Sequence, residues 1–190
     1  MSRIISGLAG SLRLSAAAKE TRPTSDRVKE SLFSTLENQG DIENARVLDL
    51  FAGSGALGLE ALSRGASSLV MVEKSKSAFG VCQKNSVLVT NALSKQGAEV
   101  SVELRNADAA NYLRAGDSSF DLVFVDPPYE FSEIKLQEIL GLLVGKLSAS
   151  GVLVLERSAK SPQVDVAGLE RYQDKTYGDT QVSFFRRFSQ

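Results

Sequence analysis

The chain has 190 residues and a formal net charge of -1, with 43% hydrophobic residues, no histidine and a single cysteine. This length suits one main domain with a substantial core, and the nearly balanced charge excludes a global field that attracts nucleic acid. Without histidine, and with Cys82 as the lone cysteine, the chain lacks the residues for Ser-His or Cys-His nucleophilic pairs, for His-liganded zinc and for an internal disulfide.

The N-terminal segment predicts a small extension ahead of the main fold. Short apolar patches around Arg3 and Arg13, separated by glycines, predict a β-hairpin over residues 1–14. Residues 1–29 carry six basic and two acidic side chains, a local balance of +4 that opposes the sign of the whole chain. This balance predicts an arm that contacts phosphates, with a solvated charged face as the alternative.

A helix should follow, with Thr24 as its N-cap and Gly40 just after its end. Its apolar face would consist of Val28, Leu32 and Leu36. No apolar run in the chain has membrane-spanning length, and the N-terminus lacks the pattern of a secretory signal. Together with the lone cysteine, these features predict a cytoplasmic protein with no membrane partner and no metal.

The segment Val47–Phe51 predicts the first strand of a parallel sheet, and it runs directly into a glycine-rich turn. Gly53, Gly55 and Gly58 form the pattern G-x-G-x-x-G before a helix that ends near Gly65. Such a turn brings backbone amides and a helix N-terminus close to a ligand. The pattern alone does not choose among nicotinamide, flavin and S-adenosylmethionine, and a purely structural turn is the alternative.

Two further strands should end in acidic residues. Leu69–Val72 leads to Glu73, which is placed to accept hydrogen bonds from the hydroxyls of an adenosine ribose. Ser75 predicts the N-cap of a helix that runs to about Thr90. The third strand, marked by alternating apolar residues from Val100 to Leu104, leads to Asp108, which is either an acceptor for an adenine amino group or an ordinary exposed acid.

The most informative stretch is Asp126-Pro127-Pro128-Tyr129, directly behind the apolar strand Phe120–Val125. The prolines cannot donate backbone hydrogen bonds and hold the chain extended, so the strand ends abruptly there. The Asp126 carboxylate and the Pro127 carbonyl then form a fixed pair of acceptors beside an aromatic ring. An ordinary turn at a strand end is the alternative.

The remaining elements complete the pattern. Ser132 predicts the N-cap of a helix with Phe131 and Leu136 as a hydrophobic staple. The buried stripe of this helix is predicted as Leu136, Ile139, Leu140, Leu143 and Leu147. Gly151–Leu155 predicts a fifth strand, and Arg171–Tyr177 with Gln181–Phe188 predicts an antiparallel hairpin. The sequence therefore predicts an α/β fold with a doubly wound, mostly parallel sheet that binds ligands at the carboxyl ends of its strands.

Methyl transfer to an exocyclic amine accounts for all of these features. The lone pair of such an amine is delocalised into its ring, and fixed acceptors for its two N–H bonds help to bend the nitrogen toward tetrahedral geometry. Tyr129 can stack on a base that has left its helix. A nicotinamide-dependent oxidoreductase explains the glycines and Glu73, but it gives no role to the two prolines.

The separated motifs resemble one known family. The tetrapeptide at Asp126 and the stretch Asp49–Gly58 look like amino-methylating enzymes that depend on S-adenosylmethionine. With Thr21–Glu30 and Tyr177–Thr180, the chain resembles the bacterial 16S ribosomal RNA guanine-N2 methyltransferases of the RsmD type. The resemblance implies a Rossmann-like methyltransferase sheet of seven strands, a product S-adenosylhomocysteine, a monomer, and a substrate in the small ribosomal subunit or an assembly intermediate.

The resemblance also assigns roles to individual residues. It implies an RNA-contacting extension at residues 1–40 and a methyltransferase domain at residues 41–190. Catalysis would involve Asp126, Pro127, Pro128 and Tyr129; cofactor binding Asp49, Phe51, Gly53, Ser54, Gly55, Ala56, Glu73, Lys74, Asp108 and Asp126; and RNA binding Arg3, Arg13, Arg22, Thr24 and Arg27. The chain departs from the family at Leu8, Gly10 and Leu12, where basic residues are common.

Three rival functions stay open at this point. The first is an adenine-N6 or cytosine-N4 methyltransferase, since the tetrapeptide does not choose the base, although 190 residues leave little room for a target-recognition insert. The second is the nicotinamide-dependent oxidoreductase. The third is a non-catalytic module that binds RNA or assists ribosome assembly.

Overall fold

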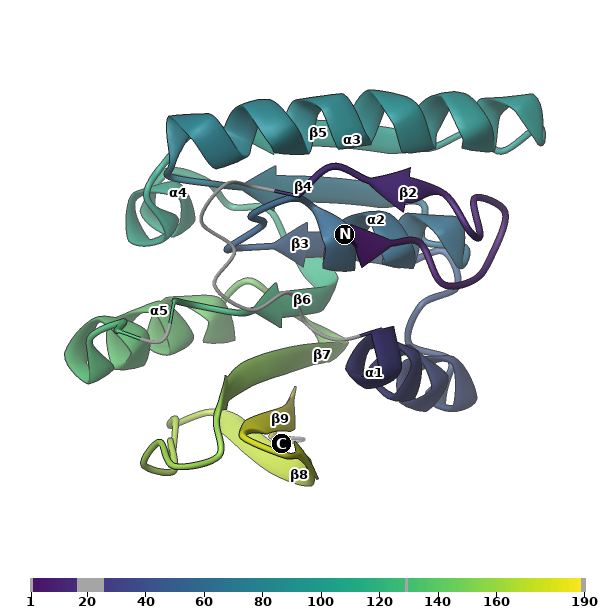
Figure 1. Cartoon of the computed structure of the whole chain (residues 1–190). Coiled ribbons are helices and arrows are strands. Elements are labelled where there is room, and N and C mark those ends of the chain that lie inside the picture. The colour runs from purple at the N-terminus through teal and green to yellow at the C-terminus, as the bar shows by residue number, and fades with distance from the viewer. Residues whose placement is uncertain (1, 17–25, 129, 189–190) are drawn as a thin grey trace.

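The computed structural model describes residues 2–16, 26–128 and 130–188 (Figure 1). Within these ranges the elements follow one another as β1 (Ser2–Arg3), β2 (Arg13–Leu14), α1 (Asp26–Gln39), β3 (Arg46–Asp49), α2 (Ala56–Ser63), β4 (Ser68–Val72), α3 (Lys76–Lys95), β5 (Ser101–Arg105), α4 (Ala109–Ala115), β6 (Phe120–Val125), α5 (Glu133–Val144), β7 (Leu147–Ser158), β8 (Leu169–Tyr177) and β9 (Thr180–Arg187). Three residues with predicted roles lie outside the described residues. They are Arg22, predicted to contact RNA, Thr24, predicted to cap α1 and contact RNA, and Tyr129, predicted to stack on the base.

Seven strands form one sheet in the order β5-β4-β3-β6-β7-β9-β8. The first five are parallel, and β9 pairs antiparallel with both β7 and β8. The short strands β1 and β2 form a separate antiparallel pair. This arrangement confirms the predicted doubly wound sheet, its C-terminal hairpin and the small N-terminal hairpin.

Helices cover both faces of the sheet, which explains why its central strands are continuously apolar. On one face, Phe33 of α1, Leu62 of α2 and Val89 of α3 share a buried cluster with Phe124 of β6. On the other face, α4 and α5 pack against neighbouring residues of the same strands, and Val125 belongs to that second cluster. The alternation between faces is the period-two pattern of a strand buried on both sides.

The structure corrects the predicted ends of two helices and adds a third helix that was not predicted. Helix α3 continues to Lys95, five residues beyond Thr90. Helix α5 ends at Val144, so Leu147 begins β7 and does not extend the stripe of the helix. Helix α4 was not predicted, because its seven residues are too few to show a helical repeat and only two of them are buried.

The two predicted N-cap residues, Ser75 and Ser132, differ in whether the side chain makes the capping hydrogen bond. The Ser75 hydroxyl accepts a hydrogen bond from the backbone N–H of Ala78, as an N-cap does. Ser132 occupies the predicted N-cap position of α5, but its side chain makes no capping hydrogen bond. The position of the helix start was therefore predicted correctly in both cases, whereas the hydroxyl contact is present only at Ser75.

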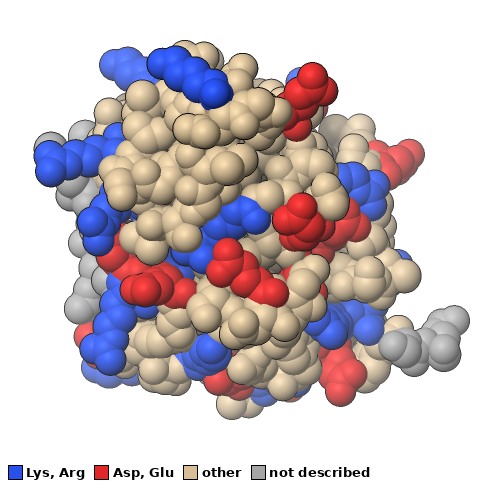
Figure 2. All heavy atoms as spheres, turned by 90° about the vertical axis from the view of Figure 1, so that its right-hand side faces the viewer, with Lys and Arg blue, Asp and Glu red and all other residues tan. Residues whose placement is uncertain are grey.

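The outer surface has no strong field of one sign on the face shown in Figure 2. This face is the right-hand side of Figure 1, and β3, β4 and β6 point toward the opposite edge. Basic and acidic side chains are interspersed on it. None of the helices in the described ranges has the length and apolar character required to span a membrane.

Candidate active site

The carboxyl ends of β3, β4 and β6 bring the predicted site residues to one edge of the sheet. Strand β3 lies between the other two, and the Asp49 position is paired with Met71 on β4 and with Phe124 on β6. The backbone N–H of Leu50 then donates to Phe124 O (3.0 Å), and that of Ala52 donates to Val72 O (3.0 Å). The glycine turn is thus held between the end of β4 and the end of β6.

The glycine turn has little room for side chains. Gly55 has a φ of +82°, and a Cβ there would stand 2.9 Å from Met71 Sδ and 3.2 Å from Cys82 Sγ. A Cβ on Gly58 would stand 2.6 Å from a methyl carbon of Leu69. The glycines therefore allow α2 to start close against β4, with its first amides at the sheet edge.

Asp49 anchors this helix to the sheet. Its side chain is buried, and Oδ2 accepts a hydrogen bond from the backbone N–H of Gly58 (3.0 Å). Burial raises the pKa of Asp49 from 3.8 to about 7; the Gly58 N–H opposes this shift and the charge of Glu73 adds to it. The observed contact positions α2, and the predicted contact of Asp49 with the cofactor stays a prediction.

Replacing Asp49 by asparagine should flatten the pH dependence of stability between about pH 4 and pH 7. The folded-state pKa lies above the ordinary value, so in this window the native protein holds a proton that the unfolded chain has lost. The contribution of Asp49 to stability then falls as the pH rises, by up to about 1.4 kcal/mol per unit, and it is constant outside the window. Asparagine keeps an acceptor for Gly58 and does not titrate. Urea unfolding at several pH values measures both slopes, and equal slopes would contradict the assignment.

Glu73 ties the end of β4 to the glycine turn. Its carboxylate accepts hydrogen bonds from the backbone N–H groups of Gly53 (2.9 Å) and Ser75 (2.6 Å). The side chain of Asn106 adds a second tie, because Nδ2 donates to the carbonyls of Glu73 (2.7 Å) and Lys74 (3.1 Å). Sequence analysis gave Asn106 no role, yet it fixes the backbone on which the predicted ribose acceptor stands.

Asp108 lies at the same edge and has two structural contacts. It caps α4 by accepting from the N–H groups of Ala110 and Asn111, and it forms an ion pair with Lys74 Nζ (3.1 Å). The hydrogen bond from Lys74 is the largest cause of the lowered pKa of Asp108. The residue is therefore an ionised acceptor near neutral pH, as the predicted contact with an adenine amino group requires.

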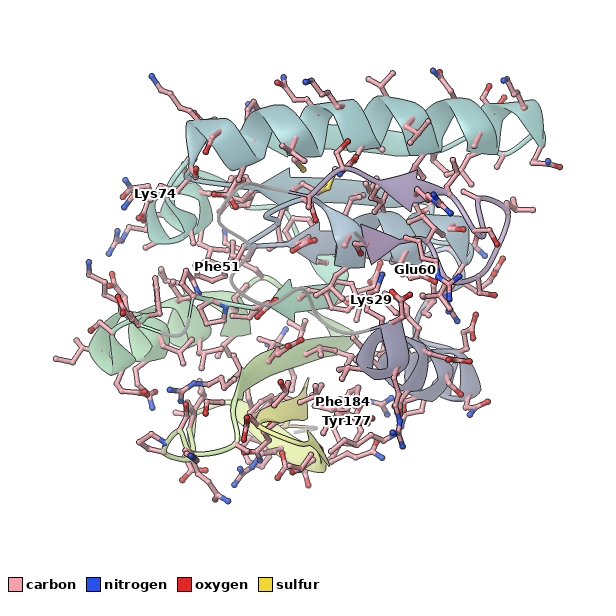
Figure 3. All side chains as sticks on the ribbon, viewed as in Figure 1. Lys29, Phe51, Glu60, Lys74, Tyr177 and Phe184 are labelled. Carbon is pink, nitrogen blue, oxygen red and sulfur yellow. The ribbon has the colours of Figure 1, made fainter. Side chains whose placement is uncertain are left out.

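The predicted acceptors follow β6 beside a hollow. Asp126, Pro127 and Pro128 line it together with Phe131, and it encloses about 380 Å³ with the part open to solvent included. The ring of Phe131 also meets Phe51 edge to face, with the centroids 5.2 Å apart. Phe51 and Lys74 both lie toward the left-hand edge of the molecule in Figure 3. The residue that precedes the glycine turn, Phe51, is thus in contact with Phe131, which follows the acceptor segment.

Asn85 of α3 is a site-supporting residue that sequence analysis missed. Its buried Nδ2 donates to Ser54 O in the glycine turn (2.8 Å) and to Ser15 O (2.9 Å), while Oδ1 accepts from Ser15 N–H (2.9 Å). One side chain therefore joins the glycine turn to the end of the N-terminal hairpin. A signal was present, because Asn85 stands at helical spacing between the apolar residues Cys82 and Val89.

Replacing Asn85 by alanine should weaken both connections. The Ser54 carbonyl loses a buried hydrogen bond, which costs about 1–3 kcal/mol, and the exposed Ser15 loses its two contacts with α3. We expect a loss of about 2 kcal/mol or more in the free energy of unfolding and a weaker affinity for S-adenosylmethionine. Urea unfolding and calorimetric titration measure the two effects. Asn91→Ala on the exposed side of α3 is the matched control, and an Asn85→Ala protein equal to this control would contradict the role.

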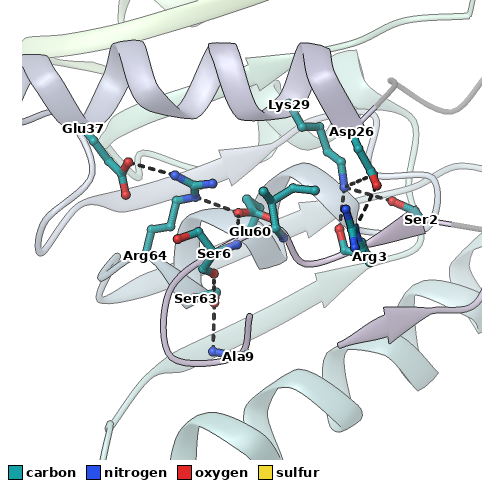
Figure 4. A network of polar contacts seen from close by, with 11 residues as sticks. Ser2, Arg3, Ser6, Ala9, Asp26, Lys29, Glu37, Glu60, Ser63 and Arg64 are labelled. Carbon is teal, nitrogen blue, oxygen red and sulfur yellow. Dashed lines mark hydrogen bonds and ion pairs between the residues drawn. The ribbon is translucent and has the colours of Figure 1, made fainter. Parts of the chain in front are cut away.

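The N-terminal hairpin is fixed to α2 by a network of polar contacts (Figure 4). The Glu60 carboxylate accepts from the backbone N–H groups of Ile5 (2.6 Å) and Ser6 (3.1 Å). The Ser63 hydroxyl donates to Ser6 O (2.5 Å) and accepts from Ala9 N–H (3.0 Å). The hairpin is therefore a rigid part of the fold.

Three predicted RNA-contacting residues are described, and all three are exposed. Arg3 and Arg13 are direct partners across the β1–β2 pair, so the hairpin presents two guanidinium groups side by side. Arg3 Nε also contacts Asp26 Oδ2 (3.0 Å) at the start of α1, the helix that carries Arg27. The hairpin and the start of α1 thus carry these arginines on adjoining elements.

Comparisons with known proteins agree with this architecture. Residues 2–186 match the family described as Conserved hypothetical protein 95. The Bacillus subtilis protein YlbH is 36% identical, with 97% of this chain and 98% of that protein covered. Ribosomal RNA small subunit methyltransferase D of Haemophilus influenzae is 34% identical, with 93% and 89% covered. The solved structure of the Escherichia coli protein yhhF is 30% identical and superposes with a TM-score of 0.81 over 100% of this chain and 99% of that chain.

Proposed function

The chain belongs to the Conserved hypothetical protein 95 family and is a methyltransferase related to ribosomal RNA small subunit methyltransferase D, and we propose how it acts. It transfers a methyl group from S-adenosylmethionine to the exocyclic N2 amine of a guanine in small-subunit ribosomal RNA. The proposal includes the catalytic roles of Asp126, Pro127, Pro128 and Tyr129.

One observation carries this function: the glycine turn and the acceptor segment are neighbours across β3 and β6. Leu50, the first residue after β3, is hydrogen-bonded to Phe124, two residues before Asp126. A cofactor on the turn would therefore stand beside the acceptors of the amine. Alignment of the two reactants in this way is the main source of catalysis in a methyl transfer that needs no strong base.

The residues at the turn fit S-adenosylmethionine. Gly53 is only half-buried, and Glu73 keeps lone pairs for ribose hydroxyls beside its two backbone contacts, because a carboxylate offers about four acceptor positions. Asp108 would accept from the adenine amino group, and Phe51, Ser54, Ala56 and Lys74 would complete the surroundings. When bound, the cofactor supplies an activated methyl group on a sulfonium sulfur.

The acceptor segment acts on the amine. The prolines fix the backbone, so the Asp126 carboxylate and the Pro127 carbonyl are preorganised to take the two N–H bonds of the amine. These contacts strengthen as the nitrogen bends toward tetrahedral geometry, and they stabilise the transition state more than the ground state. Tyr129 would stack on the base and hold its plane.

Contact with the RNA would involve Arg3, Arg13, Arg22, Thr24 and Arg27 in the extension formed by residues 1–40. Arg3 and Arg13 stand side by side on the hairpin, which suits a phosphate contact. The substrate is ribosomal RNA in the small subunit or in an assembly intermediate, which places the reaction in the cytoplasm.

The test is methyl incorporation from labelled S-adenosylmethionine, followed by nucleoside analysis. Naked ribosomal RNA, small subunits that lack the modification and duplex DNA are offered in parallel. Label in N2-methylguanosine from the RNA or the subunit supports the proposal. Label in a methylated adenine or cytosine would overturn the guanine assignment, and cofactor binding without any transfer would favour the non-catalytic module.

A further inference from the structure

The pairing of β6 with β7 brings a second carboxylate next to Asp126. Val125 is the register partner of Leu155 in this parallel ladder, so Asp126, the residue just after β6, and Glu156 on β7 are the next residues along the two chains. Neighbouring strands lie about 4.8 Å apart. Glu156 is also half-buried and lines the same hollow as Asp126.

The side of the sheet on which Glu156 lies follows from its neighbours. Val154 stands two residues before Glu156 on β7, and Val182 is the partner of Glu156 on β9. Both valines belong to the buried cluster that contains Phe124. Because residues two apart on a strand share a face, Glu156 extends that face beyond the core. Asp126 follows the end of β6, two residues after Phe124, and lines the same hollow as Glu156.

Arg157, the residue after Glu156 in β7, also lines the hollow and has contacts of its own. Arg157 donates to Pro162 O (3.1 Å) and forms an ion pair with Glu133 of α5. These contacts fix the end of β7 against α5. Glu156 is therefore the acidic group of β7 that stands closest in register to the proposed acceptor of the amine.

The bases differ in the ring atom next to their exocyclic amine. In guanine, the N2 amine adjoins N1, which carries a hydrogen. In adenine the N6 amine adjoins a bare N1, and in cytosine the N4 amine adjoins a bare N3. An ionised carboxylate only accepts hydrogen bonds, so it attracts the N1–H of guanine and repels the lone pairs of the other two bases.

We propose that Glu156 selects guanine by accepting the N1–H of the flipped base while Asp126 accepts from the adjacent N2 amine. This inference rests on the proposed function and assigns its base specificity. A carboxylate has acceptor positions for several partners at once, so the base contact is compatible with other contacts of Glu156. Rejection of a base that lacks the N1–H follows from the repulsion between the carboxylate oxygens and the lone pair of the bare ring nitrogen.

The test replaces the target guanosine of the small-subunit RNA by 2-aminopurine through ligation and reconstitution. This base keeps the amine at C2 but has a bare N1. The parent protein should methylate guanosine at least about 100-fold faster than 2-aminopurine in single turnovers. Glu156→Gln offers an amide N–H to the bare N1, so this preference should fall at least tenfold, to roughly 10-fold or less. Because the ratio is compared between proteins, the missing O6 of 2-aminopurine affects both equally.

Two comparisons keep the outcome clear. Glu170→Gln removes an exposed carboxylate at the start of β8 and should keep the parental preference. Glu170 is far from the hollow along the sheet, because its partner on β9, Arg186, pairs with Val152, four residues before Glu156 on β7. An unchanged preference in Glu156→Gln, or equal slowing on both bases, would overturn the role of Glu156. A parent protein that forms no N2-methylguanosine would instead overturn the proposed function itself.

Discussion

Replacing Asp126 by alanine lowers kcat by about 100- to 1,000-fold, the loss typical when one preorganised transition-state contact is removed. Asp126 follows the buried end of β6 and lines the hollow together with Pro127 and Pro128. Its proposed contact with the amine matters most as the nitrogen becomes tetrahedral, so the loss should appear in kcat. The affinity for S-adenosylmethionine should change by less than about threefold, because the glycine turn and Glu73 are untouched. Single-turnover methylation and calorimetric titration measure the two quantities.

The matched control is Asp121→Ala, near the other end of the same strand. Asp121 pairs with Arg46 (2.9 Å) far from the strand's carboxyl end, so its replacement leaves the acceptor segment untouched. This variant should keep the parental turnover. An Asp126→Ala protein with unimpaired turnover would remove Asp126 from the mechanism, whereas parallel losses of turnover and cofactor affinity would show that it mainly holds the cofactor.

The sheet could be predicted because its central strands are buried on both faces. The run Leu122–Val125 is completely apolar and stops at two prolines, so both its burial and its end are visible in the sequence. The glycine turn was visible for a similar reason, since few other residues tolerate its conformation at Gly55. Helix α4 shows the limit of this approach. It exists because Asp108 caps it and α5 packs beside it, and neither cause is a repeat in the sequence.

The polar support of the site was beyond sequence analysis. Asn85 and Glu60 act on residues 70 and 55 positions away, and those partners depend on the three-dimensional fold. Each residue is polar within an otherwise buried helical face, which is the only trace that such contacts leave in one sequence. The backbone of the site was thus predictable, whereas the side chains that hold it together required the structure.

Replacing Glu60 by alanine lowers the free energy of unfolding by about 3–5 kcal/mol, because a buried cation, Arg64, loses its buried partner and keeps only the half-exposed Glu37. The Glu60 side chain is completely buried, and its Oε1 lies 2.7 Å from the Nε of Arg64, whose side chain is 4% exposed. Two backbone N–H groups of the N-terminal hairpin lose their acceptor as well. Burial lowers the pKa of Lys29, and the charge of Glu60 opposes this shift. Removal of Glu60 therefore makes the charged form of Lys29 costlier. Urea unfolding at pH 7 measures the total effect.

The second partner of Arg64 supplies the control for this prediction. Glu37 lies 2.8 Å from Arg64 Nη1, but its side chain is 45% exposed, so Glu37→Ala should cost about 1 kcal/mol or less. Glu60→Gln keeps an acceptor oxygen without the charge, and its stability should fall between the other two variants. If Glu60→Ala and Glu37→Ala unfold at the same urea concentration, the buried carboxylate does not anchor the hairpin. A large loss confined to Glu60→Ala means that the N-terminal hairpin is held in place by a charge buried in α2, the helix that begins at the glycine turn.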